Sequence, residues 1–339
     1  MHSPSLSTGE HPAPDRGPVI VLGTGGTISC THGPSGDLVP TLSTADLVAR
    51  AGIPAEARDI LHLDSSNLTL EDIDALLHAI NSAIEDGAGG IILLHGTDTM
   101  EETAMAVDFF FAGTVPIVLT GAQRPADDPQ PDGPDNIRRA YQALGRSAHS
   151  GEHSPADSGS ESPARPAASS LAPASVSIAF GPDVLPAYGA TKRHTTDDRA
   201  FANASANASA SASHSATPST RPLPRPQPAP LKRLNVPIVT MFAGATADLI
   251  PQNIDGLVVE ALGSGNVPAA VAERLSELTC PVIICTRVPE GEVHFVYGGP
   301  GGGASLQRAG VRSGGSLRPS QARIELLCEL TTSRDCPQD

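Results

Sequence analysis

Aromatic side chains are scarce in this chain, which has no tryptophan, three tyrosines and seven phenylalanines among 339 residues. So few rings argue against a surface on which nucleic-acid bases stack. The formal net charge of −15 argues in the same direction, because nucleic-acid binding requires a basic surface. Long apolar runs are also missing, and none approaches the ~20 residues of a membrane span. We therefore expect neither nucleic acid nor a membrane as a partner.

Cysteine is scarce too. The cysteines are odd in number and no two have CxxC spacing, so they support neither a zinc site nor a disulfide framework; they are Cys30, Cys280, Cys285, Cys328 and Cys336. Residues 1–17 are polar and rich in proline, with one arginine and without the apolar core of a secretory signal. The sequence therefore predicts a cytoplasmic protein without a bound metal.

Strands and helices alternate along the chain. Apolar runs typical of buried strands lie at residues 19–22, 59–63, 91–95, 116–120, 175–180, 236–242, 256–261 and 281–285. Helical patterns occupy residues 69–84, a segment from 99, and residues 132–141, 267–278 and 319–330. In the first of these helices, Thr69 and Asp72 form a capping pair. This alternation predicts βαβ units and a largely parallel sheet.

Two segments interrupt the alternation. Residues 146–174 are rich in Ser, Ala, Pro and Gly, and residues 202–233 contain Asn-Ala-Ser repeats followed by prolines. Neither can bury enough apolar surface to offset the entropy of ordering, so we expect a low-complexity insert and a linker. The predicted chain then comprises a disordered tail at 1–16, a catalytic α/β domain at 17–201 and a C-terminal α/β domain at 234–339.

Two of the predicted strands end in a glycine turn that presents a threonine. Residues 19–28 read VIVLGTGGTI, and residues 90–99 read GIILLHGTDT. Ligands of open α/β sheets bind outside the carboxyl ends of the strands, so the two turns predict one shared site. Thr27 is a candidate nucleophile there if a neighbouring group removes its proton. Gly25 and Gly26 indicate a positive φ or a close backbone approach, whereas a lone threonine would merely close a strand.

The second turn supplies Thr97 and Asp98, where a strand enters a helix. Backbone N–H groups at a helix N-terminus stabilise negative charge, so they could bind a substrate carboxylate or a developing oxyanion. Asp98 could pair with an ammonium group, and helix capping is its alternative role.

Other polar residues of this turn have structural interpretations. Thr99 and Glu102 have the spacing of a capping box, and Glu101 suits the helix dipole, so we expect both glutamates to serve the helix. His95 ends an apolar strand, which favours a packed core histidine over a general base or metal ligand.

Several segments together resemble the bacterial-type L-asparaginases. The two hallmark motifs of that family are similar to residues 24–28 and 95–104. Further similar segments lie at residues 119–125, 132–134, 260–266, 286–289 and 319–323. The resemblance covers about residues 17–145, 175–200 and 234–330.

The resemblance implies two α/β domains, a larger flavodoxin-like N-domain with a mainly parallel sheet and a smaller C-terminal domain. It also implies a tetramer, built as a dimer of dimers with active sites at the dimer interface. The implied reaction is hydrolysis of the side-chain amide of L-asparagine to aspartate and ammonia, without a cofactor.

The resemblance also assigns residues. Thr27 matches the nucleophile. A second catalytic group of the family is matched by Thr97, Asp98 and Lys192. Lys192 is one of few lysines in the chain, and in this group it could accept a proton from Thr97. The residues matched to substrate binding are Ser65 and Ser66 for the α-carboxylate, Thr97, Asp98 for the α-ammonium, and Asn266, which reaches over from a neighbouring subunit.

The sequence also departs from the family pattern. Many members carry a tyrosine on a mobile loop after the first motif, but residues 28–45 contain none, and the match of Glu292 to a partner-chain glutamate is weak. Two alternatives stay open. One is a broader asparaginase and glutaminase, since one methylene is worth only ~1–3 kcal/mol. The other is a degenerate, non-catalytic amino-acid-binding protein. A tRNA-dependent amidotransferase is disfavoured, because that architecture has an extra N-terminal barrel.

Overall fold

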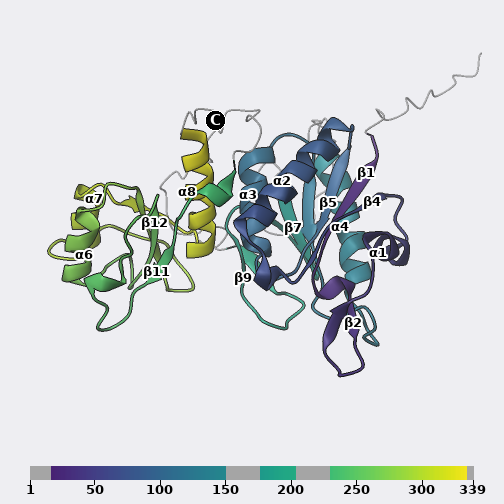
Figure 1. Ribbon diagram of the computed structural model, residues 1–339, viewed down its shortest axis with the longest axis horizontal. Coiled ribbons are helices and arrows are strands. Elements are labelled where there is room, and N and C mark those ends of the chain that lie inside the picture. Colours follow the sequence, from purple (N-terminus) through teal and green to yellow (C-terminus); the bar gives the residue numbers. More distant parts are fainter. Residues whose placement is uncertain (1–16, 150–175, 204–229, 334–339) are drawn as a thin grey trace, which may run out of the picture.

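The computed structural model describes residues 17–149, 176–203 and 230–333 (Figure 1). It confirms an α/β chain with a mainly parallel sheet in the N-domain and a smaller C-terminal α/β domain. The predicted tail at 1–16, most of the 146–174 insert and residues 204–229 of the predicted linker lie outside the described residues. Residues at the edges of those segments do belong to described elements, since α4 runs to His149 and one strand ends at Asn203.

The N-domain sheet has six strands in the order β4-β1-β5-β6-β7-β8. All neighbours are parallel except β8, which is antiparallel to β7. The strands are β1 (Val19–Gly25), β4 (Glu56–Leu63), β5 (Gly90–Leu94), β6 (Ile117–Thr120), β7 (Val176–Phe180) and β8 (Asp183–Pro186). The first five follow the flavodoxin-like order, whose topological switch point lies between β1 and β5. The predicted fold class is therefore confirmed.

Helices cover both faces of this sheet. On one face, α1 (Thr44–Ala51) and α4 (Gly133–His149) share a buried cluster with β1 and β5. On the other face lie α2 (Leu70–Glu85) and α3 (Met100–Phe111). The apolar stripe of α2 is buried, and the predicted capping box of Thr69 and Asp72 is confirmed. Both layers bury alternate side chains of the strands, so the strands are apolar on both sides.

The C-domain contains a four-stranded parallel sheet in the order β11-β12-β13-β14. Its strands are β11 (Ile238–Thr240), β12 (Leu257–Ala261), β13 (Val282–Thr286) and β14 (Arg312–Ser313). The helices α6 (Ala269–Ser276) and α7 (Gly303–Arg308) share an apolar cluster with one face of it.

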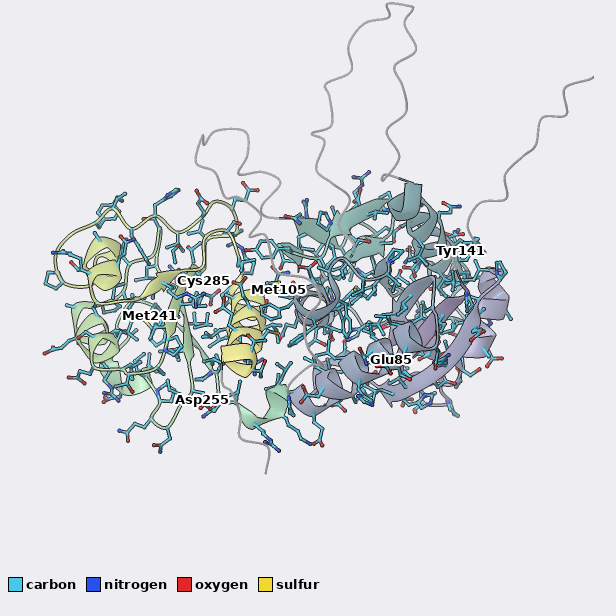
Figure 2. All side chains as sticks on the ribbon, turned by 90° about the horizontal axis from the view of Figure 1, so that it is seen from above. Glu85, Met105, Tyr141, Met241, Asp255 and Cys285 are labelled. Atoms are coloured by element: carbon cyan, nitrogen blue, oxygen red, sulfur yellow. The ribbon has the colours of Figure 1, made fainter. Side chains whose placement is uncertain are left out.

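The other face of the C-domain sheet packs against α8 (Pro319–Ser333), which lies between the two domains (Figure 1). One continuous apolar cluster contains residues of α8 such as Leu327, together with Ile283 of the C-domain and Met105 of α3. Figure 2 shows Met105 and Cys285 on either side of this helix. The two domains therefore share a core through α8.

Two hairpins complete the frame of the site. The first pairs β2 (Cys30–His32) with β3 (Leu38–Pro40), in a region that the sequence presents as a loop. Asp127 fastens it, because its carboxylate accepts from the backbone N of His32 at 2.8 Å and pairs with His32 Nδ1 at 3.0 Å. The second pairs β9 (Ala190–Lys192) with β10 (Phe201–Asn203).

Candidate active site

The Thr27 turn begins at the carboxyl end of β1, which lies between β4 and β5. Gly25 is in register with Leu63 of β4, and Gly23 with Leu94 of β5. The three strands are parallel, so the turns that follow them meet at one edge of the sheet. This edge is the switch point at which such folds bind ligands.

The two glycines before Thr27 make this meeting possible. Gly25 has φ +97° and Gly26 has φ +83°, a region that side chains disfavour. A Cβ atom on Gly25 would lie 2.7 Å from the Leu63 carbonyl oxygen, and one on Gly26 would lie 2.7 Å from Gly96 Cα. The predicted positive φ and close approach are both confirmed. Thr27 then opens the short 3-10 helix η1 (Thr27–Ser29), and within the described residues its hydroxyl makes no hydrogen bond.

Ser65 joins the turn after β4 to the turn after β5. It lies in the 3-10 helix η2 (Ser65–Asn67) and is 5% exposed, whereas Ser66 is exposed. The Ser65 hydroxyl accepts a hydrogen bond from the backbone N of Asp98 at 3.2 Å. A Cβ atom on Gly96 would lie 2.5 Å from this hydroxyl oxygen, so the glycine permits the contact.

The predicted capping box of Thr99 and Glu102 is wrong. Thr99 is the N-cap of α3, but its side chain makes no capping bond. Its hydroxyl instead donates to the Ser65 carbonyl oxygen at 2.9 Å, which ties the start of the helix to the serine turn. Glu102 faces α8, where its carboxylate lies 3.5 Å from Arg323 Nη1. Burial raises the pKa of Glu102. The capping box does not form because Thr99 and Glu102 each contact a residue far away in the sequence instead.

Lys192 ends β9 and reaches the turn after β5. Its Nζ donates to Thr97 Oγ1 at 2.8 Å and lies 3.0 Å from Asp98 Oδ1. The lysine side chain is 21% exposed and that of Asp98 is 59% exposed. A hydroxyl and an amine in direct contact can pass a proton between them, while the exposed carboxylate remains available to a cationic ligand.

Glu101, which the sequence alone predicts to serve only the helix, contacts β9 and α8. Its Oε2 accepts hydrogen bonds from the Thr191 hydroxyl at 2.6 Å and from the backbone N of Lys192 at 2.7 Å. Its Oε1 accepts from the Ser320 hydroxyl at 2.5 Å. The only signal in the sequence was its place within the matched segment 95–104.

His95 is a core residue, as predicted. It is fully buried, and burial lowers its pKa to about 4. The neutral ring is held at both nitrogens, because Nδ1 lies 2.7 Å from the Gly96 carbonyl oxygen and Nε2 lies 2.9 Å from the Thr103 hydroxyl. The carbonyl can only accept, so Nδ1 carries the proton and Nε2 accepts from Thr103. The ring stabilises the turn that bears Thr97.

Asn266 and Glu292 lie in the C-domain. Asn266 follows β12, where its Oδ1 accepts from the backbone N of Gly303 at 3.3 Å. Glu292 lies 3.5 Å from His294. Within the described residues of this single chain, no hydrogen bond joins either of them to Thr27, Ser65, Thr97, Asp98 or Lys192. We call those five residues the threonine site.

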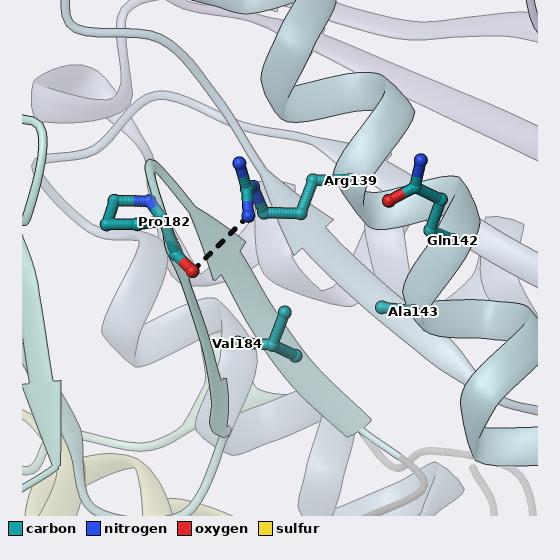
Figure 3. Close-up of a pocket in the computed structure, with 5 residues that line it drawn as sticks. All are labelled: Arg139, Gln142, Ala143, Pro182 and Val184. Atoms are coloured by element: carbon teal, nitrogen blue, oxygen red, sulfur yellow. Dashed lines mark hydrogen bonds between the residues drawn. The ribbon is translucent and has the colours of Figure 1, made fainter.

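Three further observations on the described residues concern metal ions, membranes and pockets. In residues 17–149, 176–203 and 230–333, no group of three or more His, Cys, Asp or Glu could hold a metal ion. None of the helices in these ranges has the length and apolar character needed to cross a bilayer. A depression of about 260 Å³ lies between α4 and β8 (Figure 3), lined by Arg139, Gln142, Ala143, Pro182 and Val184. None of these belongs to the threonine site, and Arg139 Nη1 already donates to the Pro182 carbonyl at 3.3 Å.

Comparison with known proteins agrees with this fold. Residues 18–154 match the family model of the asparaginase N-terminal domain, and residues 235–338 match that of the glutaminase/asparaginase C-terminal domain. The chain therefore belongs to the asparaginase family.

Similar whole proteins include a probable L-asparaginase of Deinococcus radiodurans, 29% identical over 91% of each chain. One of the subunits of the glutamyl-tRNA(Gln) amidotransferase of Methanosphaera stadtmanae is 28% identical over 91% of this chain and 70% of its own. The structure of the thermostable L-asparaginase from Thermococcus kodakarensis is also similar, with a TM-score of 0.72 and 26% identity over 94% of each chain.

Proposed function

We propose that this chain is an L-asparaginase, an amidohydrolase that converts the side-chain amide of L-asparagine to L-aspartate and ammonia. The observation that carries the proposal is the contact of Lys192 Nζ with Thr97 Oγ1 and Asp98 Oδ1, in the turn that packs against the Thr27 turn. Membership of the asparaginase family supports the same reaction class. A cytoplasmic location stays a prediction from the sequence.

In the proposed reaction, Thr27 is the nucleophile. Its oxygen forms a bond with the amide carbon, and its proton passes to the Thr97–Lys192 pair. The carbon–nitrogen bond then breaks, the nitrogen takes up a proton, and ammonia leaves an ester on Thr27. Water hydrolyses that ester, which yields aspartate and restores the hydroxyl. General acid–base help of this kind typically contributes ~10²–10⁴-fold.

Substrate binding is proposed to use the rest of the threonine site together with Ser66. The exposed Asp98 carboxylate would hold the α-ammonium group. Ser65 and Ser66, with backbone N–H groups of the turns, would hold the α-carboxylate. A ligand that makes both contacts must carry a free α-ammonium group and a free α-carboxylate on the same carbon atom. A free amino acid has both groups, whereas a residue within a peptide has neither.

The test is release of ammonia by the purified full-length chain. We expect equimolar ammonia and aspartate from L-asparagine, with the Thr27→Ala variant as the blank. Equal kcat/KM for L-glutamine would replace the proposal with the broader asparaginase and glutaminase. Turnover only with aminoacylated tRNA would favour the amidotransferase, since the chain is also similar to a component of that enzyme. Binding of asparagine without any turnover would leave an amino-acid-binding protein.

We also propose that the chain acts as a homo-oligomer, a dimer of dimers in which Asn266 completes the site of a neighbouring subunit. The support is the position of Asn266 in the C-domain, where no hydrogen bond among the described residues links it to the threonine site of its own chain. An isologous dimer would present each C-domain to the partner's threonine site.

Mixed dimers test this shared site. Thr27→Ala and Asn266→Ala chains, each poorly active alone, are co-expressed with different tags and the mixed species is isolated. One of its two sites would receive both native residues, so activity should return to about half of the native value per dimer. No recovery in isolated mixed dimers, or full activity of a monomer, would contradict the proposal.

A further inference from the structure

The Glu101 carboxylate connects three segments that meet beside the threonine site. It lies in the first turn of α3, directly after the turn that bears Thr97 and Asp98. Two of its three donors, the Thr191 hydroxyl and the Lys192 backbone N, belong to β9, and the third, the Ser320 hydroxyl, belongs to α8. A carboxylate that accepts three hydrogen bonds fixes its partners more firmly than a single contact does.

We propose that Glu101 is a positioning residue for Lys192, an inference that rests on the proposed function. The lysine side chain is long and has many rotamers, so the place of Nζ depends on where its backbone is held. Glu101 holds that backbone directly, because its Oε2 accepts a hydrogen bond from the Lys192 backbone N at 2.7 Å. Because Glu101 and Thr97 belong to the same turn and helix start, the carboxylate sets the distance between Lys192 Nζ and Thr97 Oγ1.

Other contacts show what Glu101 adds. The strand β9 is also paired with β10, in which Phe201 lies opposite Lys192. At the first residue of β9, the Ala190 carbonyl oxygen accepts a hydrogen bond from Nε2 of Gln321, a residue of α8, at 2.7 Å. These contacts hold the strand as a whole, but neither acts on the Lys192 nitrogen from the side of Thr97. The Ser320 bond makes the C-domain helix part of the same support.

Three variants test the role of Glu101. Glu101→Ala removes both carboxylate oxygens and with them all three hydrogen bonds. Displacement of a catalytic group by about 1 Å can cost ~10²-fold. We expect kcat for asparagine to fall about 10- to 100-fold, with KM within about threefold, because the substrate-binding groups stay in place. Glu101→Gln should keep most of kcat. Its amide oxygen can accept from Thr191 and Lys192, and its NH₂ group can donate to Ser320, whose hydroxyl also accepts.

Glu102→Ala is the matched control. It removes the adjacent glutamate of the same turn, which also bridges α3 to α8 but faces Arg323 instead of β9. Its melting temperature should fall at least as far as that of Glu101→Ala, while its kcat stays near the native value. A loss of kcat in both alanine variants would indicate general damage to the interdomain contact and would overturn the proposal.

A double variant separates positioning from structure. If Glu101 acts only through Lys192, then Glu101→Ala should not lower the residual kcat of Lys192→Met by more than about twofold. A further tenfold loss would overturn the inference. So would a native kcat in Glu101→Ala, or equal losses in the Gln and Ala variants.

The structure of Glu101→Ala provides a readout independent of the substrate. We expect Lys192 Nζ to leave hydrogen-bonding distance of Thr97 Oγ1. If the native chain releases no ammonia from any amide, the proposed function fails, and the reaction-based part of this inference fails with it. If the native chain is active but the 2.8 Å contact persists in the variant, the positioning role alone fails.

Discussion

Replacement of Thr27 by alanine should abolish amide hydrolysis, with a loss of at least ~10³-fold in kcat. The variant lacks the oxygen that forms the acyl-enzyme, and the neighbouring hydroxyls of Ser65 and Thr97 are already engaged. Ser65 Oγ accepts from the Asp98 nitrogen, and Thr97 Oγ1 accepts from Lys192. The measurement is a steady-state assay of ammonia release with protein whose circular dichroism and melting temperature are native.

The fold should survive this substitution. Gly25 and Gly26, not the Thr27 side chain, set the course of the turn, and the Thr27 hydroxyl makes no hydrogen bond within the described residues. Thr114→Ala is the matched control, since Thr114 follows α3 at the amino end of the sheet, where its hydroxyl donates to the Phe111 carbonyl at 2.7 Å. Near-native turnover in Thr27→Ala would reject Thr27 as the nucleophile.

Replacement of Lys192 by methionine should lower kcat by ~10²–10⁴-fold, the typical worth of a positioned proton acceptor. Methionine keeps an unbranched apolar stem of similar length, so packing around β9 is retained. The amine that touches Thr97 Oγ1 at 2.8 Å is removed. Affinity for the product aspartate, measured by calorimetry, should change far less than kcat, because Ser65 and Asp98 remain.

The chain offers a close control for this experiment. Its other lysine, Lys232, is on the surface near α2, where Nζ lies 2.5 Å from Glu71 Oε1. Exposed ion pairs contribute only ~0–1 kcal/mol, so Lys232→Met should leave both turnover and stability almost unchanged. If Lys192→Met and Lys232→Met retain the same activity, Lys192 has no part in proton transfer.

The strands and long helices could be predicted from the sequence because their signals are local. An apolar run such as residues 91–94 is buried by helices on both faces, and the stripe of α2 repeats at helical spacing. Gly25 and Gly26 indicate a close approach of the Thr27 turn to another backbone segment. Their positive φ angles and contacts with Leu63 and Gly96 confirm that interpretation.

The rest could not be predicted because it depends on long-range contacts. The short strand β9 has no periodicity of its own, and its place depends on β10, Glu101 and α8. Glu101 looks like any first-turn acidic residue until Ser320, more than two hundred residues later in the chain, is brought beside it. The failed capping box has the same cause, since Thr99 bonds to the Ser65 carbonyl oxygen instead.

The place of α8 between the domains has a consequence for synthesis on the ribosome. Met105 of α3 is buried in the same cluster as Leu327 of α8, so part of the N-domain surface is covered by residues that are translated much later. A nascent chain that ends before residue 319 still exposes the apolar face of α3, and such surfaces attract chaperones or other unfinished chains. The part of the N-domain core that packs against α8 is therefore completed only after α8 has been translated. Lys192 gains its full support only when the segment that contains Ser320 has left the exit tunnel.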